Sequence, residues 1–139
     1  MLDTTVLVAA LRSDRGASRV LLTQALEGAF TLLASVPLML EYEAVVTRPE
    51  HLEAANLSEA QVQAVLDALA VVVEPVRLAF LWRPMLADGD DDMVLETAIN
   101  GHAEMLVTVN RRDFEPARGM FKVKIVSPAE ALTRLRRKP

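Results

Sequence analysis

Hydrophobic and polar positions along the chain form two alternating kinds of segment. Short apolar runs, typical of buried strands, cover residues 2–8, 30–34, 105–109 and 122–126, with 71–73 as a further candidate. Apolar residues at helical spacing cover 18–29, 36–46, 58–71 and 92–103. The first run either ends in a polar turn or passes straight into a helix, and 110–114 is a polar turn or a short helix. The pattern therefore predicts strands that alternate with helices.

Three of the expected helices begin with clear capping residues. Ser35 followed by Pro37 is a typical N-cap and first-turn proline, and Ser127-Pro128 has the same form at the last helix. Ser58 has a glutamine at position 61, which is the spacing of a capping box. These local signals place the helix starts more firmly than hydrophobic periodicity alone.

The alternation predicts the fold class. Strands that alternate with helices form right-handed crossovers and a parallel sheet with helices on both faces. We therefore expect an α/β fold: one domain over residues 1–139, a three-layer αβα sandwich with a central parallel sheet of four to five strands. Ligands of such sheets bind outside the carboxyl ends of the strands. Asp3 and residues 108–110 are expected at that edge.

Composition narrows the functional classes. The chain has 139 residues, enough for a substantial core, and 52% of them are hydrophobic. No cysteine is present, which excludes disulfides and thiolate metal sites and suits the cytoplasm, where we expect the protein. No apolar run is long enough to span a bilayer, so we expect no membrane partner. The acid at position 3 stands so early that a truncated start stays open. A net charge of −4 argues against a passive, wholly basic nucleic-acid binder.

The most concentrated chemistry is the acidic stretch at residues 88–92, where four of five residues are aspartate. Carboxylates so close together repel one another unless they are solvated or bind a cation. A helical apolar pattern follows them at once, so a solvated, acidic helix start is the plainer interpretation. The functional interpretation gains weight from further acids that the fold would deliver to the same place.

Those acids define a candidate metal site. Asp3, Glu41 and Asp92, with Asn110 and Asp113 nearby, would form an all-oxygen pocket without His or Cys. Hard oxygen ligands select Mg²⁺ or Mn²⁺. A site of this kind supports phosphodiester hydrolysis, because the ion lowers the pKa of a bound water and holds the phosphate oxygens. Singly, Asp3 could instead cap a turn, and Glu41 could be an ordinary helix residue.

Four segments in order resemble the PIN-domain ribonucleases, in particular the toxins of toxin–antitoxin pairs. Residues 2–8 (LDTTVLV) are similar to the family's opening L-D-T-N-V-L-V. Residues 35–43 resemble the segment that carries the second acid, and residues 82–98 the segment that carries the third. Residues 107–114 (VTVNRRDF) resemble the closing T-x-N-x-x-D-F. Together the four segments span nearly the whole chain.

The resemblance implies roles for individual residues. Asp3 would be the first metal-site carboxylate, Glu41 the second and Asp92 the third, with Asp91 as a substitute. Asn110 stands where many members have a fourth acid, so Asp113 would supply it. Two other positions would support the site: Thr5, which replaces the usual asparagine, and Thr108.

The resemblance also implies partners: an RNA substrate, a cognate antitoxin and a homodimer. Arg111 and Arg112 are candidates for RNA phosphate contacts. A catalytically silent PIN-like module remains an alternative, because Thr5 and Asn110 depart from the family pattern. A haloacid-dehalogenase-like phosphatase would need a second acid at position 5, and a receiver-like domain would need a lysine after a late strand. The chain has neither.

Overall fold

The computed structural model describes residues 1–79, 86, 89–119 and 121–137. Within them, the helices are α1 Thr4–Arg12, α2 Ala17–Leu26, α3 Val36–Val46, α4 Pro49–Ala55, α5 Glu59–Val72, α6 Gly89–Asn100, the 3-10 helix η1 Arg111–Ala117, and α7 Pro128–Arg137. The strands are β1 Leu33–Ala34, β2 Glu74–Pro75, β3 Met105–Val107 and β4 Lys124–Val126. No helix in these ranges has the length and hydrophobicity to cross a bilayer.

The strands are parallel but form two separate pairs. β1 pairs with β2, with Leu33 opposite Glu74, and β3 pairs with β4, with Val107 opposite Val126. Leu2 adds a single parallel bridge to Val107. The expected parallel pairing is confirmed, but the expected central sheet of four to five strands is not found among the described residues. No strand of one pair is hydrogen-bonded to a strand of the other within the described residues, and each strand has only two or three residues.

The run over residues 2–8 is strand-like only up to Asp3, so the alternative in which it passes straight into a helix is confirmed. The amide of Asp3 donates to the carbonyl of Val107 over 2.8 Å, which ends the strand-like pairing, and α1 begins at Thr4. The buried apolar residues of this segment recur at helical intervals, at positions 6, 7, 10 and 11. A helix therefore buries them on one side, whereas a strand would split them between two faces.

The capping signals are confirmed. Ser35 caps α3 by accepting a hydrogen bond from the amide of Leu38, and α3 has the expected bounds. Ser58 and Gln61 form both hydrogen bonds of a capping box at the start of α5. The hydroxyl of Ser35 also lies 2.7 Å from that of Thr97, which connects the start of α3 to the middle of α6.

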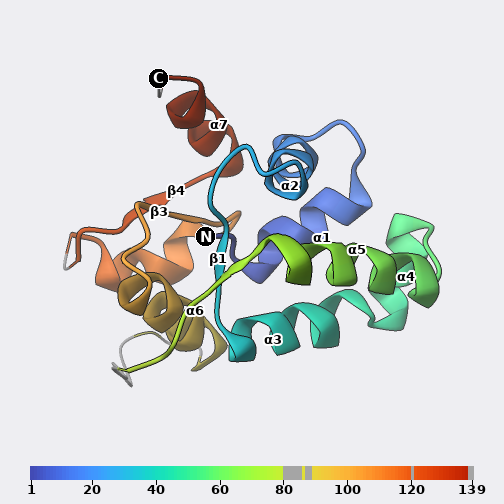
Figure 1. Ribbon diagram of the computed structural model, residues 1–139, viewed down its shortest axis with the longest axis horizontal. Helices are drawn as coiled ribbons and strands as arrows, with labels where there is room; N and C mark the ends of the chain where they lie inside the picture. The colour runs from blue at the N-terminus through green and yellow to red at the C-terminus, as the bar shows by residue number, and fades with distance from the viewer. Residues whose placement is uncertain (80–85, 87–88, 120, 138–139) are drawn as a thin grey trace.

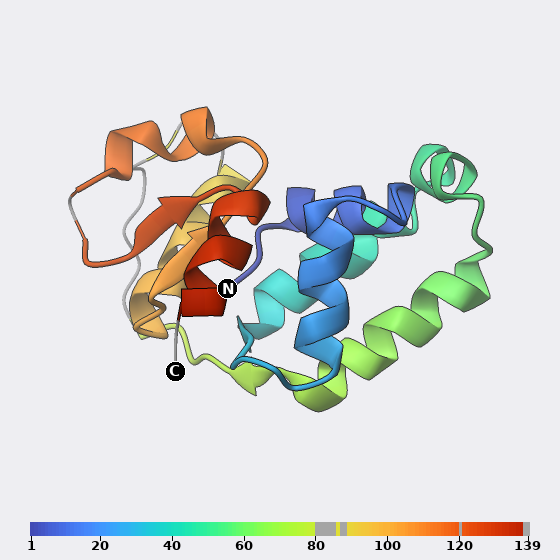
Figure 2. The same ribbon diagram turned by 90° about the horizontal axis from the view of Figure 1, so that it is seen from above.

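The helices and strands divide the molecule into two regions (Figures 1 and 2). Strands β3 and β4 lie with α6, η1 and α7, whereas helices α1 to α5 lie on the other side. The chain passes from one region to the other at Leu2, directly before α1. Fully buried side chains such as Leu7 in α1 and Leu106 in β3 belong to one hydrophobic core that extends through both regions. Asp3 therefore lies where the two regions meet.

Candidate active site

Asp3 is the centre of a buried polar cluster at the end of β3. Its side chain is only 3% exposed, and it lies between the bridge at Leu2 and the first turn of α1. Its Oδ2 atom accepts hydrogen bonds from two hydroxyls, that of Thr5 at 2.7 Å and that of Thr108 at 2.8 Å. The structure thus brings Asp3, Thr5 and Thr108 together, although they come from opposite ends of the chain.

Backbone amides orient both hydroxyls toward the carboxylate. The amide of Val109 donates to the Thr5 hydroxyl over 3.2 Å, and the amide of Asn110 donates to the Thr108 hydroxyl over 3.1 Å. Because each hydroxyl already accepts an N–H, its own proton is available to Asp3. At position 5, where the family pattern has asparagine, threonine therefore serves as a short relay between the backbone and the carboxylate.

The buried position of Asp3 deprives its carboxylate of hydration. Burial raises its pKa above the ordinary value of 3.8, and the hydroxyls of Thr5 and Thr108 act in the opposite direction. The backbone amides at the start of α1 oppose the rise as well. A buried carboxylate whose donors are all neutral attracts a cation, because a positive charge would offset the cost of desolvation.

Glu41 is joined to the same place through the residue next to Asp3. The Thr4 hydroxyl donates to Oε2 of Glu41, which is half-buried on α3. Its neighbour Tyr42 is fully buried and donates its hydroxyl to the carbonyl of Leu2. Burial raises the pKa of Tyr42, and the negative charges of Asp3 and Glu41 raise it further. Two consecutive residues of α3 thus contact the residues on either side of Asp3, Leu2 and Thr4.

The contacts made by Thr4 and Tyr42 have no counterpart in the sequence interpretation. Thr4 reads as an ordinary residue of the opening motif, and Tyr42 as an apolar position of a helix. A signal does exist for Tyr42, because a buried tyrosine hydroxyl requires a hydrogen-bond partner. The sequence gives no means of identifying that partner as the carbonyl of Leu2.

Asp92 lies on α6, in the first turn, and is 3% exposed. Its Oδ1 atom accepts a hydrogen bond from the amide of Leu86 over 2.8 Å. Glu96 follows one turn later on the same helix and is fully buried, although the sequence interpretation gave it no role. The sequence signal for Glu96 was its spacing of four residues from Asp92, which places the two acids on one face of a helix. Asp91 is half-buried, and Asp90 is exposed.

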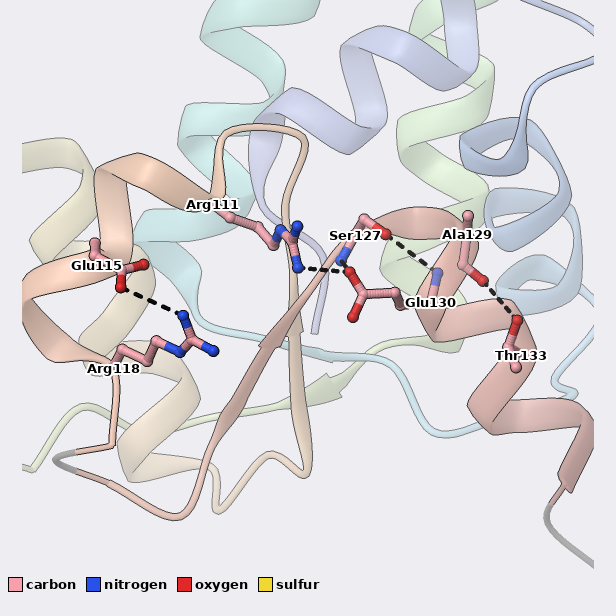
Figure 3. A network of polar contacts seen from close by, with 7 residues as sticks. All are labelled: Arg111, Glu115, Arg118, Ser127, Ala129, Glu130 and Thr133. Atoms are coloured by element: carbon pink, nitrogen blue, oxygen red, sulfur yellow. Dashed lines mark hydrogen bonds and ion pairs between the residues drawn. The ribbon is translucent and has the colours of Figure 1, made fainter.

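The remaining candidates lie on or beside η1. Asn110, Asp113 and Arg112 are exposed. Arg111 forms an ion pair with Glu130 of α7, with 2.6 Å between Nη1 and Oε1 (Figure 3). The candidates at residues 82–84 and Asp88, which complete the third-acid segment, lie outside the described residues.

The donor set suits a hard divalent ion in part. Asp3 and Glu41 are carboxylates connected through the adjacent hydroxyls of Thr4 and Thr5, and Mg²⁺ needs only one or two carboxylates because it keeps several waters. Within the part of the chain that the structure describes, no three Asp, Glu, His or Cys side chains are grouped closely enough to hold one metal ion. Asp3 and Glu41 supply two of the carboxylates of the expected set, and each accepts a hydrogen bond from a hydroxyl in the first turn of α1.

The sequence matches a model of the PIN domain over residues 1–112. This match covers most of the chain, from the first residues to η1. A PIN domain implies an αβα fold, of which the structure shows the parallel strand pairs and a majority of helix. No curated protein and no solved structure matches the chain.

Proposed function

We propose, on the premise that this chain belongs to the PIN-domain family, that it is a metal-dependent endoribonuclease. PIN domains are generally nucleases and typically use divalent metal ions. The observation that carries the proposal is the buried Asp3 carboxylate, which two oriented hydroxyls hold in place without neutralising its charge. A buried carboxylate with only neutral donors is suited to bind a cation. Because its burial lowers the stability of the fold, such a residue is a candidate for a functional role.

In this proposal Asp3 and Asp92 hold Mg²⁺ or Mn²⁺, and Glu41 and Asp113 complete the catalytic acids. When bound, the ion would lower the pKa of a water and stabilise charge on the phosphate. Thr5 and Thr108 orient Asp3, and the Thr4 hydroxyl orients Glu41. Asp91 is a substitute for Asp92, and Asn110 supports the site through its backbone amide. Arg111 and Arg112 would contact RNA phosphates at the beginning of η1.

We also propose that the protein is the toxin of a toxin–antitoxin pair, acting in the cytoplasm as a homodimer. A buried carboxylate such as Asp3, whose hydroxyl donors are neutral, favours a partner that presents a basic side chain, which is the chemistry by which an antitoxin would block it. Induced expression in a bacterial host should then slow growth, and Asp3→Asn should restore it. Equal growth inhibition by both forms would contradict a toxin that acts through this site.

A catalytically silent PIN-like module is the second candidate. Two observations favour it: the described residues contain no group of three possible metal ligands, and the neutral Asn110 occupies the position of the fourth acid. Such a module would bind RNA or a protein partner without cleaving RNA.

Incubation of the purified protein with RNA separates the two candidates. We expect cleavage with Mn²⁺ or Mg²⁺, none with EDTA, and a loss of at least about a hundredfold in Asp3→Asn and in Asp92→Asn. This estimate is a lower bound, because even groups that merely orient a metal ligand are worth about 10- to 100-fold. Asp14→Asn is the matched control, since Asp14 is an exposed acid in the loop after α1.

Each outcome assigns the function. Cleavage that survives unchanged in Asp3→Asn would locate the activity elsewhere and overturn the proposal. An absence of cleavage in the wild type, together with calorimetric binding of Mn²⁺ that Asp3→Asn removes, would favour the silent module.

A further inference from the structure

A basic groove of about 860 Å³ lies between η1, β4 and α7. Its walls come from the 3-10 helix, the strand that follows it and the first turns of the last helix. Two acidic residues, Glu115 and Glu130, line it, against six basic ones: Arg111, Arg112, Arg118, Lys122, Lys124 and Arg134. In a chain of net charge −4, this is a strong local concentration of positive charge.

Ion pairs use only part of that charge. Arg111 pairs with Glu130 at 2.6 Å and Arg118 with Glu115 at 3.4 Å, as Figure 3 shows. Within the described part of the chain, the other basic side chains of the groove form no ion pair: Arg112, Lys122, Lys124 and Arg134. Among the described residues, the groove therefore presents four exposed cations that form no ion pair, and the charge of one of them, Arg134, acts on Glu130.

The groove begins beside the Asp3 cluster. The amide of Thr108 donates to the carbonyl of Val126 over 3.0 Å, so the carboxyl ends of β3 and β4 lie together. Val126 lines the groove, and the hydroxyl of Thr108 holds Asp3. One residue, Thr108, therefore links the Asp3 carboxylate to the strand that lines the groove, so the two sites are neighbours.

The lining favours RNA over an acidic peptide. A nuclease that gathers carboxylates repels the phosphates it must bind, so it needs cations beside the acids rather than among them. The groove also includes Phe121, and aromatic rings stack on the bases of single-stranded nucleic acid. Resting on the proposed function, we infer that this groove binds the phosphate backbone of a single-stranded RNA substrate as it leaves the site at Asp3.

The test measures RNA binding separately from RNA cleavage. A fluorescein-labelled single-stranded RNA of mixed sequence is titrated in EDTA, at several salt concentrations, with the wild-type chain and with Lys124→Gln/Arg134→Gln. We expect the double variant to bind roughly tenfold more weakly, and the slope of log affinity against log salt to fall in magnitude by about 1.4. Circular dichroism melts verify that the variant is folded.

The matched control is Arg15→Gln/Arg48→Gln. It removes the same charge from two exposed arginines, one in the loop between α1 and α2 and one at the start of α4. Both of these segments lie on the side of the molecule away from β4 (Figure 1). Affinity and salt slope should match the wild type. Equal losses in control and groove variants would mean general attraction to the chain, and would overturn the inference.

Two further measurements complete the test: the binding of a polyglutamate peptide and the kinetics of RNA cleavage. Binding of the peptide as tight as that of RNA, with the same dependence on Lys124 and Arg134, would assign the groove to an acidic protein partner instead. In cleavage, the groove variant should raise KM and leave kcat unchanged, and an unchanged KM would overturn the inference. Groove-dependent RNA binding by a wild type that cleaves nothing would support the groove and refute the nuclease.

Discussion

The Asp3 cluster and the basic groove lie side by side but hold their charges in opposite ways. Asp3 is 3% exposed and is surrounded by neutral donors, whose hydroxyl protons fix its orientation. The cations of the groove are on exposed side chains, and two of them are paired with exposed carboxylates. The Asp3 cluster thus has one buried charge in a fixed orientation, whereas the groove has several charges on solvent-exposed side chains.

The difference determines what each region can contribute. A buried charge is screened little by salt, so its energetic effect is large and depends on the position of a few atoms. Exposed charges more than a Debye length apart are largely screened, so each is worth little and their effects are collective. Chemistry therefore fits the Asp3 cluster, and capture of a long polyanion fits the groove.

After the replacement of Asp3 or Asp92 itself, removal of one oriented hydroxyl should have the largest effect. Thr108→Val keeps the shape of the fully buried side chain but leaves Asp3 without one of its two hydroxyl donors. We expect kcat for RNA cleavage to fall by about 10- to 100-fold, as for other groups that orient a metal ligand. The loss should be equal at low and high salt, because the interaction is buried.

Thr108→Ser is the control, since it restores the hydroxyl and removes only a methyl group. It should recover most of the wild-type kcat. If Thr108→Val and Thr108→Ser were equally active, the hydroxyl would have no positioning role, and the contrast with the groove would lose its basis.

Asp3→Asn should stabilise the fold as it removes activity. Burial raises the pKa of Asp3 in the folded state, so the unfolded chain releases this proton more readily. The contribution of Asp3 to stability is therefore greatest below pH 3.8 and decreases as the pH rises through the folded-state pKa. Asparagine avoids this loss.

We expect a gain of about 1 kcal/mol in the free energy of unfolding at neutral pH, a size common when a strained functional residue is replaced. Urea unfolding in EDTA measures it. The difference between variant and wild type should shrink as the pH is lowered toward the range where Asp3 is protonated. A constant difference across pH would show that the gain has another origin.

Local signals explain which parts of the fold could be predicted from sequence. The starts of α3 and α7 follow from Ser35-Pro37 and Ser127-Pro128, whose effects reach only a few residues along the chain. The sequence left the segment after Asp3 open, because a run of apolar residues fits a strand and a helix equally well. Its burial at positions 6, 7, 10 and 11 depends on tertiary packing, which the run itself does not display.

The candidate site, like the fold, could be predicted from the sequence only in part. Asp3 and Thr108 were expected at one edge because Asp3 lies on the first expected strand and Thr108 at the end of a later one, and the structure joins them by a hydrogen bond. The links made by Thr4 and Tyr42 join α3 to residues 2–4, which are distant in sequence, and no local pattern encodes them. The proposed roles of Asp92 and Asp113 rest on the family resemblance and stay predictions.

The smallest expected effect comes from an acid of the groove. Glu130 accepts a hydrogen bond from the amide of Ser127 and pairs with Arg111, and its contacts with Ser127 and then the charge of Arg111 lower its pKa. Glu130→Gln keeps an oxygen that can cap α7, as glutamine does in capping boxes, but it releases the arginine. RNA affinity in EDTA should rise roughly two- to fivefold, the range of an exposed ion pair of up to about 1 kcal/mol. The gain should vanish at high salt, and Glu53→Gln on α4, an exposed acid remote from the groove, should produce none. A gain that persists at high salt would mean that Arg111 contacts RNA in a buried, specific manner, and the two regions would then differ less than their exposures indicate.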